Sequence, residues 1–239
     1  MRVFILSVLI ELVLFSMSID AQDIVSDTLV DLNGDGKPEI IVLKNNESFG
    51  FILSISGIQY TDSPYDNPPD RLEIIDIDKT DTYKEVLLHF PSSTDDPDDG
   101  NMILWYNGSS IFKMGDCIGW PVFPGNGIVY IDHYTGFWTQ RDKYEIDPST
   151  GKLIHVPQYG YFVGVRATVK KPFVIYREQE LQHKVALLAR DSEIELILYA
   201  PGNNELVAHF YLVKSQTGLT GWVKEFDVFD YLEGIPYFD

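Results

Sequence analysis

A stretch of nine residues, 31–39, places oxygen-bearing side chains at alternating positions. It reads Asp31-Leu32-Asn33-Gly34-Asp35-Gly36-Lys37-Pro38-Glu39, and the apolar residues 40–43 follow at once. Oxygen side chains at positions 1, 3 and 5 converge when a glycine follows, and a carbonyl at position 7 and a carboxylate at position 9 complete the set that Ca²⁺ prefers. The stretch predicts a calcium loop, although an Asx-rich turn held by side-chain-to-backbone hydrogen bonds has the same composition.

The spacing of this loop differs from that of an EF-hand. An EF-hand loop ends with glutamate at position 12 and lies between helices, whereas Glu39 stands at position 9 and precedes a run typical of a β-strand. The combination resembles the FG-GAP (VCBS-like) repeat, the calcium-loop repeat of integrin-type β-propellers, over about residues 28–130. The resemblance implies that the side-chain ligands are Asp31, Asn33, Asp35 and Glu39, and that Lys37 offers its carbonyl.

A second acidic stretch, residues 76–85, resembles the first. It reads Asp76-Ile77-Asp78-Lys79-Thr80-Asp81-Thr82-Tyr83-Lys84-Glu85 and leads into another apolar run. The spacing from Asp81 to Glu85 equals that from Asp35 to Glu39, but Thr82 replaces the turn glycine, which leaves metal occupancy open. By the same resemblance the second set of ligands is Asp76, Asp78, Asp81 and Glu85.

The sequence shows no third metal loop. Residues 131–138 are expected to be its structural equivalent, but they lack alternating oxygen side chains. Two or three such units are fewer than the roughly four to eight blades of a closed propeller. We therefore expect a short, partial propeller-like array of β-repeats, with completion of a ring by another chain as the alternative.

The rest of the chain predicts an all-β protein. Short β-rich runs recur between turn residues, at 40–43, 51–55, 72–75, 86–90, 102–106 and 127–131, and residues 144–153 form an expected hairpin. The composition changes near residues 157–160, where a new series of strands begins. This predicts a repeat domain over residues 22–160 and a second domain over residues 161–239.

The second domain is expected to be a small barrel. Five β-rich runs lie between Val163 and Val228, and the last hairpin ends in Thr220-Gly221-Trp222-Val223. This ending resembles the bacterial SH3 (SH3b) family, whose members commonly bind cell-wall peptide, peptidoglycan or partner proteins, although many copies are only structural. The resemblance makes Trp222 the candidate ligand-binding residue, and a core or rim position is the alternative.

Composition and motifs exclude several function classes. The chain has 18 Lys+Arg against 36 Asp+Glu, a formal net charge of −18, which argues against nucleic-acid or anionic-membrane binding through a general basic surface. Its single cysteine, Cys117, rules out an intrachain disulfide and is expected to be a buried apolar residue. The sequence contains no HExxH pattern, nucleophile elbow or phosphate loop, so no catalytic residues are predicted.

The N-terminus resembles a secretory signal peptide. Arg2 provides a positive start, the residues up to Met17 are almost wholly apolar, and cleavage fits after Ala21 or Ser18. Residues 1–21 are thus expected to be removed, which would leave a secreted or periplasmic protein with no transmembrane anchor. Glu11 is unusual within the apolar region because a carboxylate there is costly to insert.

Together these features predict an exported, calcium-binding, non-enzymatic protein that has a structural or interaction role. Its expected partners are cell-wall peptide, glycan or another exported protein. Two alternatives stay open: a cell-wall or glycan-binding adhesion protein, for which the aromatic-rich region 105–138 offers stacking side chains, and an atypical secreted hydrolase. A hydrolase would need a pocket with two carboxylates in opposed environments.

Overall fold

The structure of this chain is a computed structural model that describes residues 24–46, 50–92, 99–202 and 209–236. The predicted signal peptide, residues 1–21, lies outside the described residues. Within the described part, no helix is long and apolar enough to span a bilayer. The elements are almost all strands, which confirms the all-β class, and none of the sheets closes on itself.

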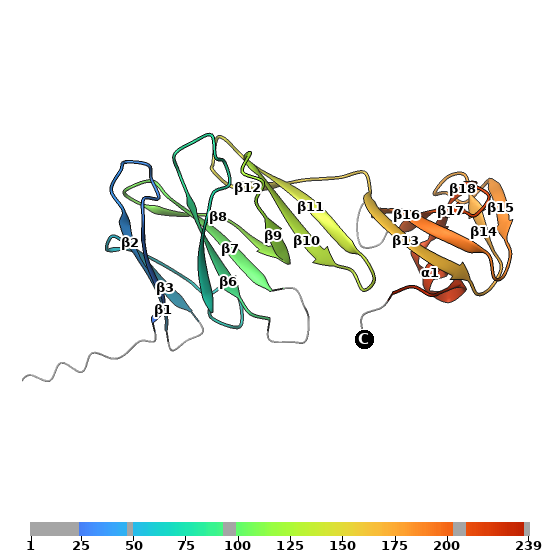
Figure 1. The fold of residues 1–239 in the computed structure, drawn as a ribbon, viewed down its shortest axis with the longest axis horizontal. Coiled ribbons are helices and arrows are strands. Elements are labelled where there is room, and N and C mark those ends of the chain that lie inside the picture. The colour runs from blue at the N-terminus through green and yellow to red at the C-terminus, as the bar shows by residue number, and fades with distance from the viewer. Residues whose placement is uncertain (1–23, 47–49, 93–98, 203–208, 237–239) are drawn as a thin grey trace, which may run out of the picture.

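The first part of the described chain forms three antiparallel sheets of four strands each, and in each the strands pair in chain order (Figure 1). Sheet 1 contains β1 (Ile24–Val30), β2 (Glu39–Asn45), β3 (Phe51–Ile55) and β4 (Ile58–Asp62). Sheet 2 contains β5 (Arg71–Ile75), β6 (Glu85–Phe90), β7 (Gly100–Tyr106) and β8 (Ile111–Ile118). Sheet 3 contains β9 (Trp120–Val122), β10 (Ile128–Tyr134), β11 (Thr139–Ile146) and β12 (Leu153–Val156).

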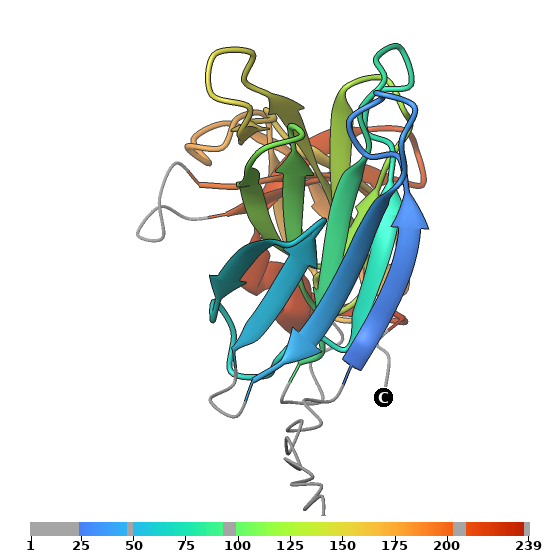
Figure 2. The same ribbon diagram turned by 90° about the vertical axis from the view of Figure 1, so that its left-hand side faces the viewer.

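The three sheets stack face to face, and successive residues of each strand point to opposite faces of its sheet. In sheet 1, Ile41 and Leu43 are fully buried and pack against sheet 2, whereas Ile40 between two buried neighbours is exposed. Sheet 2 lies in the middle and is buried on both faces, so its strands β6 and β7 are buried at nearly every residue. Leu88 faces sheet 1 and Leu87 faces sheet 3. Figure 2 views the ribbon from the end at which sheet 1 lies.

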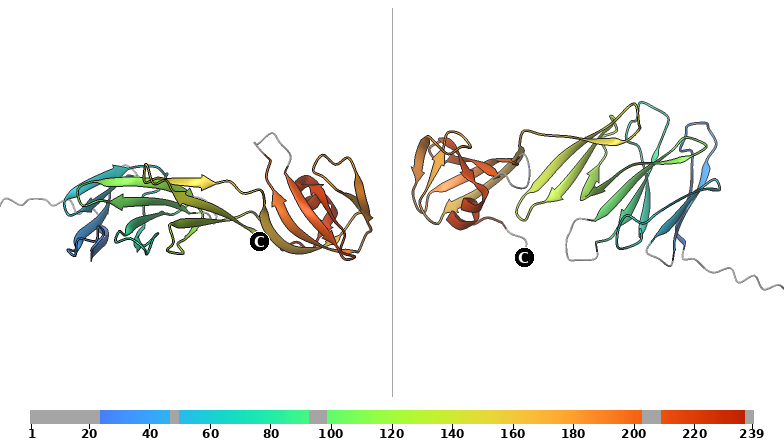
Figure 3. Two further views of the ribbon diagram at one scale, coloured as in Figure 1. Left: turned by 90° about the horizontal axis from the view of Figure 1, so that it is seen from above. Right: turned by 180° about the vertical axis from the view of Figure 1, so that it is seen from behind.

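The remaining strands form one seven-stranded antiparallel sheet, the C-terminal sheet, in the order β15-β14-β18-β17-β16-β13-β19. Its strands are β13 (Tyr161–Val169), β14 (Phe173–Tyr176), β15 (Lys184–Leu188), β16 (Glu193–Ala200), β17 (Phe210–Ser215), β18 (Thr220–Lys224) and β19 (Leu232–Glu233), and the helix α1 (Glu225–Tyr231) precedes β19. The sheet curves around its own core, which includes Ile175, Leu196 and Val223. Sheet 1 and the C-terminal sheet lie at opposite ends of an elongated molecule (Figure 3).

The hairpin between β10 and β11 joins sheet 3 to the C-terminal sheet. Its tip carries Phe137 and Trp138, which are 4% and 5% exposed and belong to the core of the C-terminal sheet. The indole Nε1 of Trp138 donates a hydrogen bond to the Tyr211 hydroxyl at 3.3 Å, and the Phe137 ring packs against the rings of Tyr211 and Phe229. The two parts of the chain therefore share one apolar core at this point.

The strands expected from the sequence are present, with differences of a few residues at their ends. The structure adds several elements that the sequence reading missed, among them β1, β4, β8, β9, β15 and α1. The last strand of sheet 3 ends at Val156 and the first strand of the C-terminal sheet begins at Tyr161, on either side of residue 160.

Candidate functional site

The two predicted metal loops occupy the same place in consecutive sheets. Residues 31–38 connect the first two strands of sheet 1, and residues 76–84 connect the first two strands of sheet 2. The loops also touch, because the backbone N–H of Lys84 donates to the carbonyl of Leu32 at 2.9 Å. The candidate ligands thus lie along one edge of the stack, on loops that repeat with the sheets.

The first loop is held closed by its own side chains. The Asp31 carboxylate accepts hydrogen bonds from the N–H groups of Gly34 and Gly36, at 2.7 and 2.8 Å. The side-chain oxygens of Asn33 and Asp35 each accept from the N–H two residues ahead, at 2.9 and 2.8 Å. These are Asx turns, and they use one lone pair on each oxygen while a second lone pair stays free for another partner.

The last glutamate of each loop is a buried carboxylate that anchors the loop to its strand. Glu39 is 6% exposed and Glu85 is 4% exposed. Each accepts a hydrogen bond from the N–H of the residue that follows the loop's first aspartate, Leu32 at 2.8 Å and Ile77 at 3.1 Å. The second carboxylate oxygen of Glu39 also accepts from the Asn33 amide at 2.8 Å. The equivalence of the two glutamates follows from this shared contact.

The second loop leaves its carboxylates less well compensated. Asp76 has a buried Oδ1 with no hydrogen-bond partner among the described residues. Burial of the Glu85 side chain, together with repulsion from Asp81 and Asp76, raises the pKa of Glu85 to about 7, although the hydrogen bond from Ile77 acts in the opposite direction. Asp78 accepts hydrogen bonds from both the N–H and the hydroxyl of Thr80. An unpaired buried acceptor beside mutually repelling carboxylates is an arrangement that a cation would stabilise.

The two loops differ in how well their contacts suit a calcium ion. Among the described residues, no group of three or more His, Cys, Asp or Glu side chains is arranged to hold a metal ion. The side-chain oxygens of Asp31, Asn33 and Asp35 in the first loop accept hydrogen bonds from the loop's own backbone, and Lys37 and Asp35 are exposed. The second loop has the orphaned Asp76 oxygen. The donor types suit Ca²⁺ in both loops. The unpaired buried oxygen that a cation would satisfy lies in the second loop, although the first loop matches the calcium-loop pattern better.

The third sheet has a short connection in place of a metal loop. Residues 123–127 connect β9 to β10, and the N–H of Gly127 donates to the carbonyl of Ile77 at 2.8 Å, just as Lys84 donates to Leu32. The expectation that residues 131–138 form the equivalent of a third loop is therefore wrong. Those residues form most of β10 and the hairpin tip that enters the C-terminal core.

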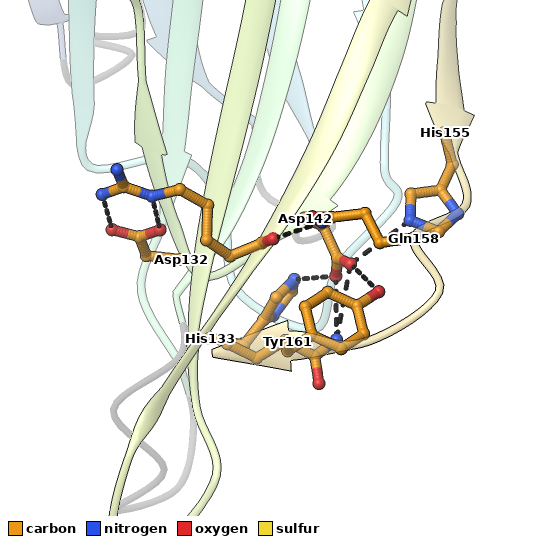
Figure 4. A network of polar contacts seen from close by, with 8 residues as sticks. Asp132, His133, Asp142, His155, Gln158 and Tyr161 are labelled. Atoms are coloured by element: carbon orange, nitrogen blue, oxygen red, sulfur yellow. Dashed lines mark hydrogen bonds and ion pairs between the residues drawn. The ribbon is translucent and has the colours of Figure 1, made fainter. Parts of the chain in front are cut away.

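A polar cluster centred on Asp142 was not anticipated from the sequence (Figure 4). The Asp142 carboxylate, 8% exposed, accepts from the Tyr161 hydroxyl at 2.6 Å and contacts Nε2 of His133 and Nε2 of His155, each at 3.2 Å. These hydrogen bonds outweigh the effect of burial and hold the pKa of Asp142 far below its usual range. The members come from β10, β11, β12 and β13, so only strand pairing brings them together and no local motif marks them.

Cys117 lies near this cluster, but its thiol is not activated as a nucleophile. Cys117 and His133 both line a hollow of about 480 Å³ between sheets 2 and 3, together with Tyr65, Asp116 and Tyr144. Burial of the thiol, reinforced by the Asp116 carboxylate, raises the pKa of Cys117 to about 12, and a thiol that stays protonated is a poor nucleophile. Asp116 is the only carboxylate in the described lining, and it is paired with Lys113 at 2.5 Å.

Trp222 lies on the face of the C-terminal sheet that points away from the core. Strand register places it between Tyr176 of β14 and Leu212 of β17. Leu212 is paired with Leu198 of β16, and Leu198 with Phe162 of β13. Residues paired across antiparallel strands point to the same side, so these five side chains form one row across the sheet, the outer row. Phe162 at its end is 72% exposed and Trp222 is half-buried.

Basic side chains flank the outer row. Exposed Lys184 is paired with Tyr176 at one end of the row, and exposed Lys224 lies two residues beyond Trp222. Arg166 and Lys214 lie on the same face, on either side of Glu195 in the register. An apolar strip with charged residues at its edge has the general composition of an interaction surface.

Comparison of the chain with protein families, with curated proteins and with solved structures found no match.

Proposed function

We propose that this chain is an exported, calcium-binding, non-enzymatic protein in which FG-GAP/VCBS-like sheets carry an SH3-like interaction module. In this proposal the first three sheets are a short propeller-like array, and the C-terminal sheet is the module that meets a partner. The observation that carries the calcium part is the orphaned buried Oδ1 of Asp76 beside Asp81 and Glu85.

The second loop is the favoured place for the ion. Its ligands would be Asp76, Asp78, Asp81 and Glu85, and the first loop would use Asp31, Asn33, Asp35, Glu39 and the carbonyl of Lys37. Bound calcium would supply positive charge that offsets the repulsion among the carboxylates. Asp78 and Asp81 order the second loop by accepting hydrogen bonds from the N–H groups of Thr80 and Tyr83. Glu85, the first residue of β6, accepts from the N–H of Ile77 and so ties the start of the loop to that strand.

The calcium proposal is tested by calorimetry of the purified protein with CaCl₂, MgCl₂ or EDTA. At calcium concentrations of about 100 times Kd, binding adds about 2.7 kcal/mol to the free energy of unfolding, which corresponds to a rise in Tm of roughly 5–10 °C for a chain of this size. Asp76→Asn should abolish the rise if the second loop holds the ion, and Asp35→Ala should do so if the first loop does.

Asp147→Ala is the matched control for these variants. Asp147 is also an aspartate that caps a turn, through hydrogen bonds to Ser149 and Thr150, but it lies outside both loops. This variant should keep the calcium response. A wild-type protein whose Tm is the same in CaCl₂ and EDTA would rule out the calcium proposal.

The outer row favours a second candidate function, that of an adhesion protein which binds cell-wall material or glycan. Aromatic side chains on an exposed sheet face can stack on sugar rings or peptide groups, and Trp222 and Tyr176 are neighbours there. Pull-down on peptidoglycan and binding to glycan arrays, with Trp222→Ala and Phe162→Ala, test this function. Leu187→Ala is the control, because Leu187 is 69% exposed on β15 but is not part of the row.

A further inference from the structure

Sheet 1 presents an apolar face that nothing in the described chain covers. One face of the sheet packs against sheet 2, and the other, its outer face, carries Leu29 and Ile40. These two residues are paired across β1 and β2 and are 62% and 61% exposed. Val42 and Ile52 continue the same face, half-buried. Exposed aliphatic side chains that lie next to one another on a sheet are more typical of interaction surfaces than of surfaces that face only water.

A further sheet cannot join this face in the way that the three sheets join one another. Each internal junction uses the N–H that precedes the second strand of a sheet, Lys84 in sheet 2 and Gly127 in sheet 3, to donate to the preceding sheet. The equivalent residue of sheet 1 is Pro38, which precedes β2 and has no N–H. The outer face therefore lacks the hydrogen bond that would continue the stack or close it into a ring.

The charges on this face are self-complementary. Along the described strand residues that point outward, the charged side chains are Asp27, paired with Val42, and Lys44, paired with Ile52. Neither forms an ion pair with any other described residue. When two identical faces are related by a two-fold axis, the acid of each copy can lie opposite the base of the other, so the same ion pair forms twice.

We propose that the outer face of sheet 1 is a homodimer interface in which Leu29 and Ile40 of two copies pack together and Asp27 of each lies opposite Lys44 of the other. Sheet 1 forms the end of the elongated molecule (Figure 3), so two copies can meet there without contact between their C-terminal sheets. This interface is independent of calcium binding and of the outer row.

The size of the face predicts a weak, reversible dimer. Four strands about 4.8 Å apart and roughly 20 Å long give a face of several hundred Å². Stable interfaces bury about 800 Å² on each partner. We therefore expect a dissociation constant in the micromolar range.

Sedimentation velocity between about 1 and 300 μM tests the proposal. We expect the average mass to rise toward twice that of the chain as concentration increases. Leu29→Lys and Ile40→Lys should each reduce the association at least tenfold, with an unchanged Tm because both side chains are exposed. Leu187→Lys, at an equally exposed leucine of the C-terminal sheet, should leave the association unchanged.

The charges permit a stricter test. Asp27→Lys and Lys44→Asp should each weaken the dimer, because like charges then face each other, and the double variant Asp27→Lys/Lys44→Asp should restore it. A wild-type chain that stays monomeric at 300 μM overturns the proposal. So does a dimer that survives Leu29→Lys, or one whose single charge variants are not rescued by the swap.

Discussion

The Cβ atom of Thr82 lies 2.3 Å from the point that a Cβ atom on Gly34 would occupy, so the second loop fills the space that a side chain in the first loop would need. Gly34 also has a positive φ of 74°. In the sequence, Thr82 stands where the first loop has a turn glycine. Its side chain in fact packs against the neighbouring loop.

This contact predicts that Gly34→Ala is destabilising beyond the effect of backbone strain. Gly36 provides the control, since its φ is 83° but a Cβ atom there would have no neighbour within 4 Å. Gly36→Ala should cost about 1 kcal/mol in the free energy of unfolding, and Gly34→Ala about 1–3 kcal/mol more. Urea denaturation measures the difference. Equal losses for the two variants would contradict the contact.

The raised pKa of Glu85 predicts a pH dependence for the metal-free protein. The pKa is about 7 in the folded chain against an ordinary 4.5, so between these values the folded state binds more protons than the unfolded state. The free energy of unfolding should therefore fall as the pH rises from about 5 to about 8, by an amount on the order of 2 kcal/mol.

Glu85→Gln isolates this effect, because the amide keeps the shape of the side chain but does not titrate. The variant should lose the decline between pH 5 and 8 in EDTA. His89 contributes with the opposite sign, since burial and Arg71 lower its pKa, and it is present in both proteins. Equal pH profiles of the free energy of unfolding would show that Glu85 is not the group responsible.

The Asp142 cluster predicts a large loss of stability when its carboxylate is removed. Asp142→Ala leaves Tyr161 and two histidines without their shared acceptor, so we expect the free energy of unfolding to fall by about 2–4 kcal/mol. Asp132→Ala is the control, because the pair of Asp132 with Arg141 at 2.7 Å lies near the surface. It should cost at most about 1 kcal/mol, as measured by urea denaturation of both variants at pH 7.

The hairpin tip predicts cooperative unfolding of the two ends of the chain. Trp138→Ala opens a cavity between the hairpin and the C-terminal sheet and should cost about 3–5 kcal/mol. We expect calorimetry to show one transition in the wild type and two in the variant. Trp120→Ala, at a tryptophan that is 43% exposed, should keep the single transition. Two transitions in the wild type would show that the shared core does not couple the two parts.

The sequence predicted those parts of the fold that depend on local patterns. The uninterrupted apolar run 40–43 indicates β2, and Pro148 with Gly151 indicates the turn between β11 and β12. The strands β4 and β9 were missed because they contain few apolar residues or are very short.

The sequence alone predicts the two acidic loops, but not the contacts that distinguish them or the other candidate sites. Regular spacing revealed both loops, but the orphaned oxygen of Asp76 depends on how the loop packs, which spacing does not contain. Asp142 lies 9 residues from His133 and 13 from His155 in the chain, and it meets them through the register of β10, β11 and β12. The place of Trp222 in an outward-facing row likewise depends on pairing among five strands.

The two ends of the stack restrict how such a chain could lengthen by gene duplication. Pro38 lies at one end, and the hairpin tip that enters the C-terminal core lies at the other. A copied unit placed before sheet 1 would meet a proline where it needs a donor, and one placed after sheet 3 would displace Phe137 and Trp138 from their core. Only an internal duplication that brings both a donor like Lys84 and an acceptor like Leu32 would preserve every junction. New units are therefore expected between existing sheets, and not at either end.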